Sequence, residues 1–267
     1  MKKTLVVFLM TCGLLGVTAD AAVVISVNLT YNDASNGNPS LNASDTTGVI
    51  PAANWNQVTA GNLGSSITPA SGIALNYSTG ANSGATFAHS SSGGAYVPRR
   101  SINKSSAFTN DEKLMAGYFQ RYTLTSGSHS YTVTGLSDAV TQFGYNLYVY
   151  VGTPNVGVAH NEVGQYRVTS GSFDQTIWVV NGNVYTGNFV DGGTSSTLQT
   201  AGTGNYIVFS GLTESSFTLT GIHSADSRGS GINGFQIEGL SIPEPGTVVL
   251  MLMAFGLISI TRKRLTK

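Results

Sequence analysis

Side chains that could perform acid–base, nucleophilic or metal chemistry are few in this 267-residue chain, and their spacing is irregular. The four histidines are His89, His129, His160 and His223. None belongs to an H-x-H or H-E-x-x-H motif, which would hold zinc on one face of a strand or helix. No serine lies in the G-x-S-x-G turn of an α/β-hydrolase. We therefore expect the histidines on the surface and predict no catalytic residue and no metal centre of this kind.

Carboxylates are also scarce and unpaired in the sequence. Hydrolysis of a glycosidic bond needs two carboxylates that flank the bond, and no pair of Asp or Glu stands out at strand spacing. Asp33, Asp45 and the Asn-rich segment Asn36–Asn42 carry oxygen atoms of the kind that bind calcium. A solvated loop with Asx turns explains the same residues. We favour the solvated loop and expect no cofactor, with a structural calcium ion as the alternative.

Glycan binding requires only an aromatic ring for the apolar face of a sugar and a few polar groups that orient its hydroxyls. Two short segments and one loop offer both kinds of group. The candidate glycan-binding residues are Trp55 with Asn54, Tyr148 with Tyr150, and Asp226 with Arg228 in the loop before the last expected strand. Each has a structural alternative. The tryptophan could be a core anchor, the tyrosines could pack against a second sheet, and the loop could simply be solvated.

The charge balance excludes one class of partner. Lys and Arg total 13, as do Asp and Glu, and only 10% of the residues are charged. Several of the cations stand at the two ends of the chain, so residues 22–241 carry more acidic than basic groups. Nucleic-acid binding needs a basic surface that displaces counterions from phosphate. We therefore expect no nucleic-acid partner.

The elements that position these candidates are expected to be strands, because apolar and polar residues alternate along most of residues 22–241. In the segment 145–151, Leu147 and Val149 would lie on one face, and Tyr148 and Tyr150 on the other. Further strands are expected at residues 23–29, 73–77, 122–124, 131–133, 165–169, 176–180, 184–190, 205–210, 216–220 and 234–240. The Asn181-Gly182 pair favours a hairpin with a type I′ turn at that point.

A single short helix is expected among these strands. The sequence from Thr109 to Glu112 fits a capping box, and Gly117 would end the helix. Many short strands without alternating helices predict an all-β domain over residues 22–241. We expect an antiparallel β-sandwich of jelly-roll or galactose-binding-like type.

The N-terminal segment is typical of a secretory signal peptide. Lys2 and Lys3 precede an apolar run from Leu5 to Val17, and an Ala-x-Ala site follows at residues 19–21. We predict a signal peptide over residues 1–21. Cys12, the single cysteine, would leave with it, so the domain must fold without disulfides.

The C-terminal segment 242–267 has three parts in a fixed order. Pro243, Glu244 and Pro245 separate it from the folded domain, because proline interrupts both helices and central strands. An uncharged apolar stretch follows, for which we predict a transmembrane helix at 247–261, short enough to need some thinning of the bilayer. The basic cluster Arg262, Lys263 and Arg264 would hold its end on the cytoplasmic side.

This Pro-Glu-Pro motif, apolar helix and basic tail together resemble the PEP-CTERM sorting signal of exported bacterial proteins. The segments Ala53–Asn56, Met115–Tyr118 and Ile232–Ile237 are also similar to a β-sandwich module of such proteins, to which no activity is attached. The resemblance implies a Gram-negative bacterium and processing near residues 243–245 by an exosortase, a membrane-bound cysteine transpeptidase or protease.

The same resemblance implies a route and a function. We expect an exported protein that stays in the inner membrane as an intermediate and then reaches the cell surface or the extracellular matrix. There it would be a non-catalytic structural or adhesive component associated with exopolysaccharide. The alternative is an extracellular carbohydrate-binding module or a carbohydrate-active enzyme.

Overall fold

The computed structural model describes residues 22–32, 39–62, 68–92, 96–100, 108–121, 126–152, 163–181, 185–227 and 229–241. The residues from Ala22 to Leu240 form one compact unit. Among the described residues, no helix is long and apolar enough to cross a membrane. The expected signal peptide at 1–21 and the expected helix at 247–261 both lie outside the described residues.

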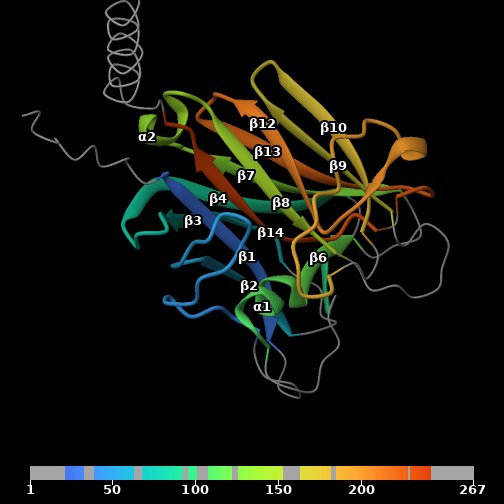
Figure 1. The fold of residues 1–267 in the computed structure, drawn as a ribbon, viewed down its shortest axis with the longest axis horizontal. Coiled ribbons are helices and arrows are strands. Elements are labelled where there is room, and N and C mark those ends of the chain that lie inside the picture. Colours follow the sequence, from blue (N-terminus) through green and yellow to red (C-terminus); the bar gives the residue numbers. More distant parts are fainter. Residues whose placement is uncertain are drawn as a thin grey trace, which may run out of the picture. The chain divides into compact units, whose positions relative to one another are not determined.

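Seven strands build the first sheet, which we call the β8 sheet (Figure 1). Its main path is β12 (Tyr206–Leu212), β8 (Tyr145–Val151), β14 (Ile232–Gly239), β1 (Val24–Asn32) and β2 (Asn56–Asn62). The remaining strands are β6 (Gly117–Arg121), which pairs with β14, and β5 (Tyr96–Arg100), which pairs with β6.

The second sheet, called the β9 sheet, also has seven strands. In order they are β11 (Gly202–Thr203), β10 (Phe173–Val180), β9 (Val163–Ser170), β13 (Ser216–His223), β7 (Gly127–Thr134), β4 (Asn82–Ser92) and β3 (Ala70–Asn76). The helices are α1 (Asn110–Ala116), α2 (Asp138–Thr141) and a 3-10 turn at Leu198–Thr200.

The core lies between the two sheets because each sheet turns its apolar face inward. Leu147 and Val149 of β8 and Phe235 of β14 pack with Leu219 of β13 and Val168 of β9 in one buried cluster. Tyr148 and Tyr150 therefore lie on the outer face of the β8 sheet, as the alternation along β8 predicts.

The strand order is that of a jelly roll. The β8 sheet contains β1-β14-β8-β12, and the β9 sheet contains β7-β13-β9-β10. The first strand thus lies beside the last, and the chain crosses repeatedly between the sheets, as in two interlocked Greek keys. The prediction of an all-β sandwich is confirmed.

Three local expectations were wrong. The sandwich is not purely antiparallel, since β2 runs parallel to β1 and β11 parallel to β10. No strand forms over the described part of 184–190. Asn181 does not start a type I′ turn, because its φ is not positive and its buried side chain instead donates to Tyr166 Oη (2.6 Å) and to the carbonyl of Gly229 (2.8 Å).

The short helix is confirmed. Thr109 Oγ1 accepts a hydrogen bond from the backbone N–H of Glu112 (3.2 Å), and Glu112 Oε2 accepts one from the N–H of Thr109 (2.7 Å), which together form the capping box. The helix ends where Gly117 adopts extended backbone and starts β6. A side chain at Gly117 would meet the ring of Tyr31 at 2.8 Å, so close packing requires glycine there.

Candidate ligand-binding face

The histidines are placed differently from the expectation. His89, His129 and His223 are all buried, so the prediction that they lie on the surface is wrong for these three; His160 lies outside the described residues. Burial, and then the neighbouring His223, lower the pKa of His129 from 6.5 to about 3. Burial also lowers the pKa of His89. With pKa values below 6.5, His89 and His129 are mostly neutral at neutral pH.

Several described carboxylates hold structural contacts. Asp174 forms a two-pronged ion pair with Arg167 on the exposed face of the β9 sheet, at 2.5 and 2.7 Å. Glu112 caps α1. Among the described residues, no group of three or more His, Cys, Asp or Glu side chains could hold a metal ion.

Trp55 and Tyr150 belong to a small second core. The exposed fraction of Trp55 is 5% and that of Tyr150 is 0%, and their ring centroids lie 6.0 Å apart. The Tyr150 hydroxyl accepts from the N–H of Val49 (2.6 Å) and donates to Gln236 Oε1. Both rings are buried where the segment 39–55 packs on the β8 sheet, which corrects the expectation that they offer a face to a glycan. For Trp55, the alternative of a core anchor holds.

Asn54 serves the same segment. It has a positive φ of 50°, a conformation that Asn tolerates better than most residues. Its backbone N–H donates to the carbonyl of Ala43 (2.9 Å), and its side chain donates to the carbonyl of Ser78 (2.8 Å). The residue shapes a turn, and its amide group is engaged by the protein.

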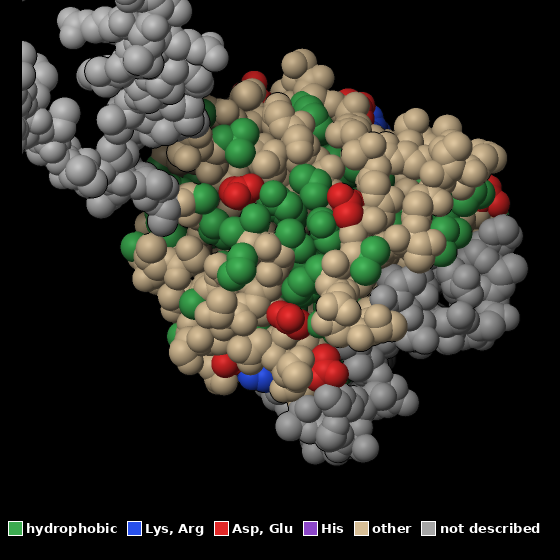
Figure 2. All heavy atoms as spheres, in the orientation of Figure 1, with side chains coloured by type: hydrophobic (Ala, Val, Ile, Leu, Met, Phe, Trp, Pro, Cys, Tyr) green, Lys and Arg blue, Asp and Glu red, His purple; other side chains and the backbone are tan. Residues whose placement is uncertain are grey.

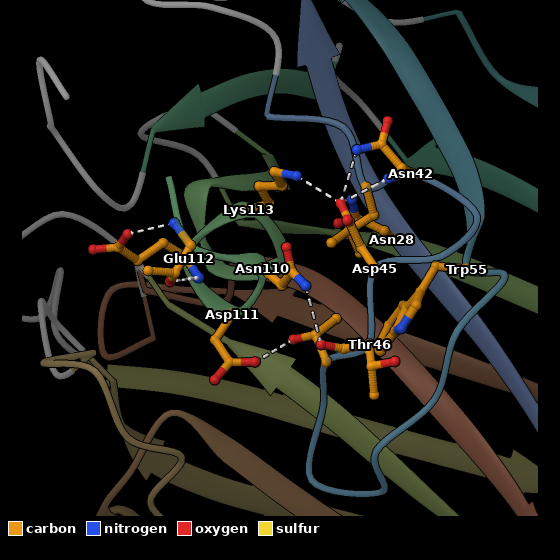
Figure 3. Close-up of polar contacts among 12 residues, drawn as sticks. Asn28, Asn42, Asp45, Thr46, Trp55, Asn110, Asp111, Glu112 and Lys113 are labelled. Carbon is orange, nitrogen blue, oxygen red and sulfur yellow. Dashed lines mark hydrogen bonds and ion pairs between the residues drawn. The ribbon is translucent and has the colours of Figure 1, made fainter. Parts of the chain in front are cut away.

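Polar contacts fasten segment 39–55 to helix α1 (Figure 3). Lys113 Nζ lies 2.5 Å from Asp45 Oδ2, and the backbone N–H of Asn42 donates to the same oxygen at 2.9 Å. The hydroxyl of Thr47 donates to Asp111. The hydrogen bond from Lys113 is the main reason that the pKa of Asp45 lies below its usual 3.8. These contacts hold segment 39–55, which covers Tyr150, against helix α1.

The calcium prediction stays a prediction. Asp33 and residues 36–38 lie outside the described residues. Asp45 has the ammonium group of Lys113 as its cationic partner, and the amide of Asn42 already binds the same carboxylate. The ammonium group of Lys113 would therefore compete with a calcium ion for this carboxylate.

Tyr148 is partly exposed on the outer face of the β8 sheet. Its hydroxyl donates to Glu238 Oε2 on the neighbouring strand β14 (2.9 Å), and Asn146 Nδ2 donates to the same oxygen (3.3 Å). Burial and this hydrogen bond to Glu238 raise the pKa of Tyr148 to about 12. The tyrosine hydroxyl is thus a fixed donor, and the carboxylate is oriented by two neighbours.

Two further tyrosines on this face also lie beside carboxylates. Burial, and then the charge of Asp191, raise the pKa of Tyr206. Burial, and then Asp111, raise the pKa of Tyr185 well above 10. The ring of Tyr206 packs 6.5 Å from that of the buried Tyr150. We call the set Tyr148, Tyr185, Tyr206, Glu238, Asp191 and Asp111 the acidic tyrosine face.

Figure 2 shows hydrophobic side chains gathered over the middle of this face, with acidic side chains spaced around them and Lys or Arg only at its margin. Partly exposed Val49, Ile50, Phe189 and Val208 contribute to the apolar surface. An aromatic and aliphatic surface with a rim of hydrogen-bond acceptors can bind a ligand that has both an apolar face and N–H or O–H donors.

The last two candidate glycan-binding residues are Asp226 and Arg228. Asp226 is exposed in the loop between β13 and β14, where its backbone N–H donates a hydrogen bond to Ser224 Oγ (3.2 Å). Arg228 lies outside the described residues. Of the candidates, the structure places Tyr148 on the acidic tyrosine face. The sequence did not predict Glu238 as a site residue. Its position two residues after Gln236 indicates only that it points outward from β14.

Comparison with known proteins identifies the C-terminal segment. Residues 241–264 match the family model of the PEP-CTERM protein-sorting motif. The match contains Pro243, Glu244 and Pro245 and the basic residues 262–264, so the chain carries this motif where the sequence predicted it. The match leaves the sandwich uncovered. No curated protein matches the chain. The motif supports an exported protein that an exosortase sorts.

Proposed function

We propose that this exported, exosortase-sorted protein is a non-catalytic structural or adhesive component that associates with exopolysaccharide at the cell surface or in the extracellular matrix. The observation that carries the proposal is the sorting motif at residues 241–264. It is attached to a jelly-roll domain.

The proposed route passes through the inner membrane. The apolar stretch 247–261 would hold the chain there as an intermediate, with Arg262, Lys263 and Arg264 on the cytoplasmic side. The exosortase would then act near Pro243, Glu244 and Pro245 and release the sandwich toward the surface.

A non-catalytic role is supported by the state of the groups that could react. The three described histidines are buried, and burial lowers the pKa of His129 and of His89, so neither is a proton carrier at neutral pH. Asp45 and Asp174 are each held in an ion pair. Such contacts suit a rigid domain that displays a surface.

The test is fractionation of the host's extracellular material. The protein should co-purify with the polysaccharide fraction, and enzymatic depolymerisation of that polysaccharide should release it. Incubation of the purified protein with the same polysaccharide should liberate no reducing ends. Recovery of the protein free of polysaccharide would contradict the proposed association, and steady release of product would show the carbohydrate-active enzyme instead.

A carbohydrate-binding module is the second candidate, and one observation favours it. Tyr148 and Tyr206 are partly exposed beside oriented or charged carboxylates on one face of the sandwich. This is the combination of groups that a sugar requires.

A further inference from the structure

We infer that the acidic tyrosine face binds a glycan that carries free amino groups, and that it discriminates against glycans built from uronic acids. The inference rests on the proposed association with polysaccharide and names the face and the class of sugar. Three features of the face support it: its apolar surface, its charge and the orientation of one carboxylate.

The apolar surface has the right composition for a sugar ring. Tyr148 and Tyr206 are partly exposed on adjacent strands, since β12 pairs with β8, and Val208 stands opposite Tyr148 in the register. Tyr206 also rests on the buried ring of Tyr150, which in turn packs against Phe189 (5.3 Å). The platform is therefore backed by a packed aromatic cluster, and ordering it on binding costs little side-chain entropy.

The charge of the face selects among sugars. Glu238 accepts a hydrogen bond from the Tyr148 hydroxyl, Asp191 forms a β-bridge with Tyr206, and the charge of Asp111 acts on Tyr185. Among the side chains that the structure describes, the cations are Lys113 and Arg167, and each is already paired with an aspartate. Among the described side chains, an anionic polymer would meet negative charge without an unpaired cation. An ammonium group, by contrast, is attracted both by the carboxylates and by the tyrosine rings.

The orientation of Glu238 provides a specific acceptor. Tyr148 and Asn146 both donate to Oε2 of this carboxylate, and among the described residues nothing bonds Oε1. A carboxylate fixed by two donors needs no reorganisation to accept an N–H or O–H from a ligand, and a hydrogen bond to a charged group is stronger than a neutral one. An amino group of a sugar stacked on Tyr148 can donate to this free oxygen.

The test is a titration of the protein, in the form purified from the host envelope, with three oligosaccharides of equal length: glucosamine, N-acetylglucosamine and galacturonate oligomers. The glucosamine oligomer should bind, with an affinity that falls as salt is raised. Acetylation, which removes the charge, should weaken binding about tenfold, and the galacturonate oligomer should not bind.

Variants locate the site. Glu238→Gln should weaken binding of the glucosamine oligomer about tenfold, and Tyr206→Ala should weaken it by a similar factor through loss of the ring. Trp178→Ala is the matched control, because Trp178 is a partly exposed aromatic residue on the β9 sheet. This variant should bind the glucosamine oligomer as the unmodified protein does. Thermal melts check that each variant is folded.

The outcomes separate this inference from the proposed function. Preference for neutral or anionic oligomers would overturn the inference and leave the association with polysaccharide intact. Binding that survives Glu238→Gln and Tyr206→Ala would also overturn it, since the site would then lie elsewhere. Failure to bind any glycan, together with absence from the polysaccharide fraction, would overturn both.

Discussion

Acidification should destabilise this protein through His129. The exposed fraction of this side chain is 0%, and it packs edge-on against Tyr131 with ring centroids 5.4 Å apart. Its pKa is about 3 in the folded protein and near 6.5 in an unfolded chain. Below pH 6.5 the unfolded state therefore binds a proton that the folded state does not bind. The free energy of unfolding consequently decreases as the pH falls from 6.5 toward 3.

The magnitude follows from the difference between the two pKa values. At pH 4.5 the unfolded histidine is almost fully protonated and the folded one is almost fully neutral. The two pH units that separate pH 4.5 from 6.5 correspond to about 2.7 kcal/mol at about 1.36 kcal/mol per unit. This is a large fraction of the stability of an ordinary domain. His89, whose pKa burial also lowers, adds a loss of the same sign.

Urea denaturation at pH 7 and pH 4.5 measures the effect. The variant His129→Gln has lower stability at pH 7 because its packing is disturbed, but its further loss between pH 7 and pH 4.5 should be smaller than that of the unmodified protein by about 2.7 kcal/mol. Ser216→Ala, at an exposed position of β13, should keep the full pH dependence. If His129→Gln loses as much stability on acidification as the unmodified protein, the assignment of a buried neutral histidine is refuted.

Three further substitutions test the packing of the domain. Tyr150→Phe removes a hydroxyl that bonds the backbone of segment 39–55 and the buried Gln236, and should cost about 1–3 kcal/mol in urea denaturation. Thr109→Ala removes the cap of α1 and should cost about 1 kcal/mol by the same assay, whereas Thr109→Ser should retain most of it. Gly221→Ala would place a carbon 2.2 Å from the ring of His129 and should lower the melting temperature, by an amount corresponding to about 1–3 kcal/mol or more; an unchanged melting temperature would contradict the packing around that ring.

The architecture followed from the sequence because alternation with period two is a local property. β8 illustrates this, since the alternation along residues 145–151 alone predicts which side chains point inward and which point outward. The capping box at Thr109 and Glu112 is equally local and was also found. The order of the strands, and the parallel pairing of β2 with β1, depend on contacts between distant segments that no local pattern records.

At the candidate site, the difference between what local sequence predicts and what distant contacts decide is larger. Tyr148 and Tyr150 point to the same face of β8, and each lies between two aliphatic residues in the sequence. Contacts with distant residues, such as Trp55 and Phe189, enclose the ring of Tyr150 and leave that of Tyr148 partly exposed. Glu238 meets Tyr148 because β14 pairs with β8 over a separation of 90 residues. The histidines were expected outside because they are polar, yet the sandwich encloses His129 in its neutral form.

Delivery to the envelope is the central claim, and the intact mass of the protein recovered from the host's surface and matrix fractions tests it most directly. We predict a mass that lacks residues 1–21 and the apolar stretch after Pro245, and accumulation of the longer, membrane-held form when the exosortase is deleted. A surface form that still contains residues 248–267, or an unchanged mass without the exosortase, would contradict it.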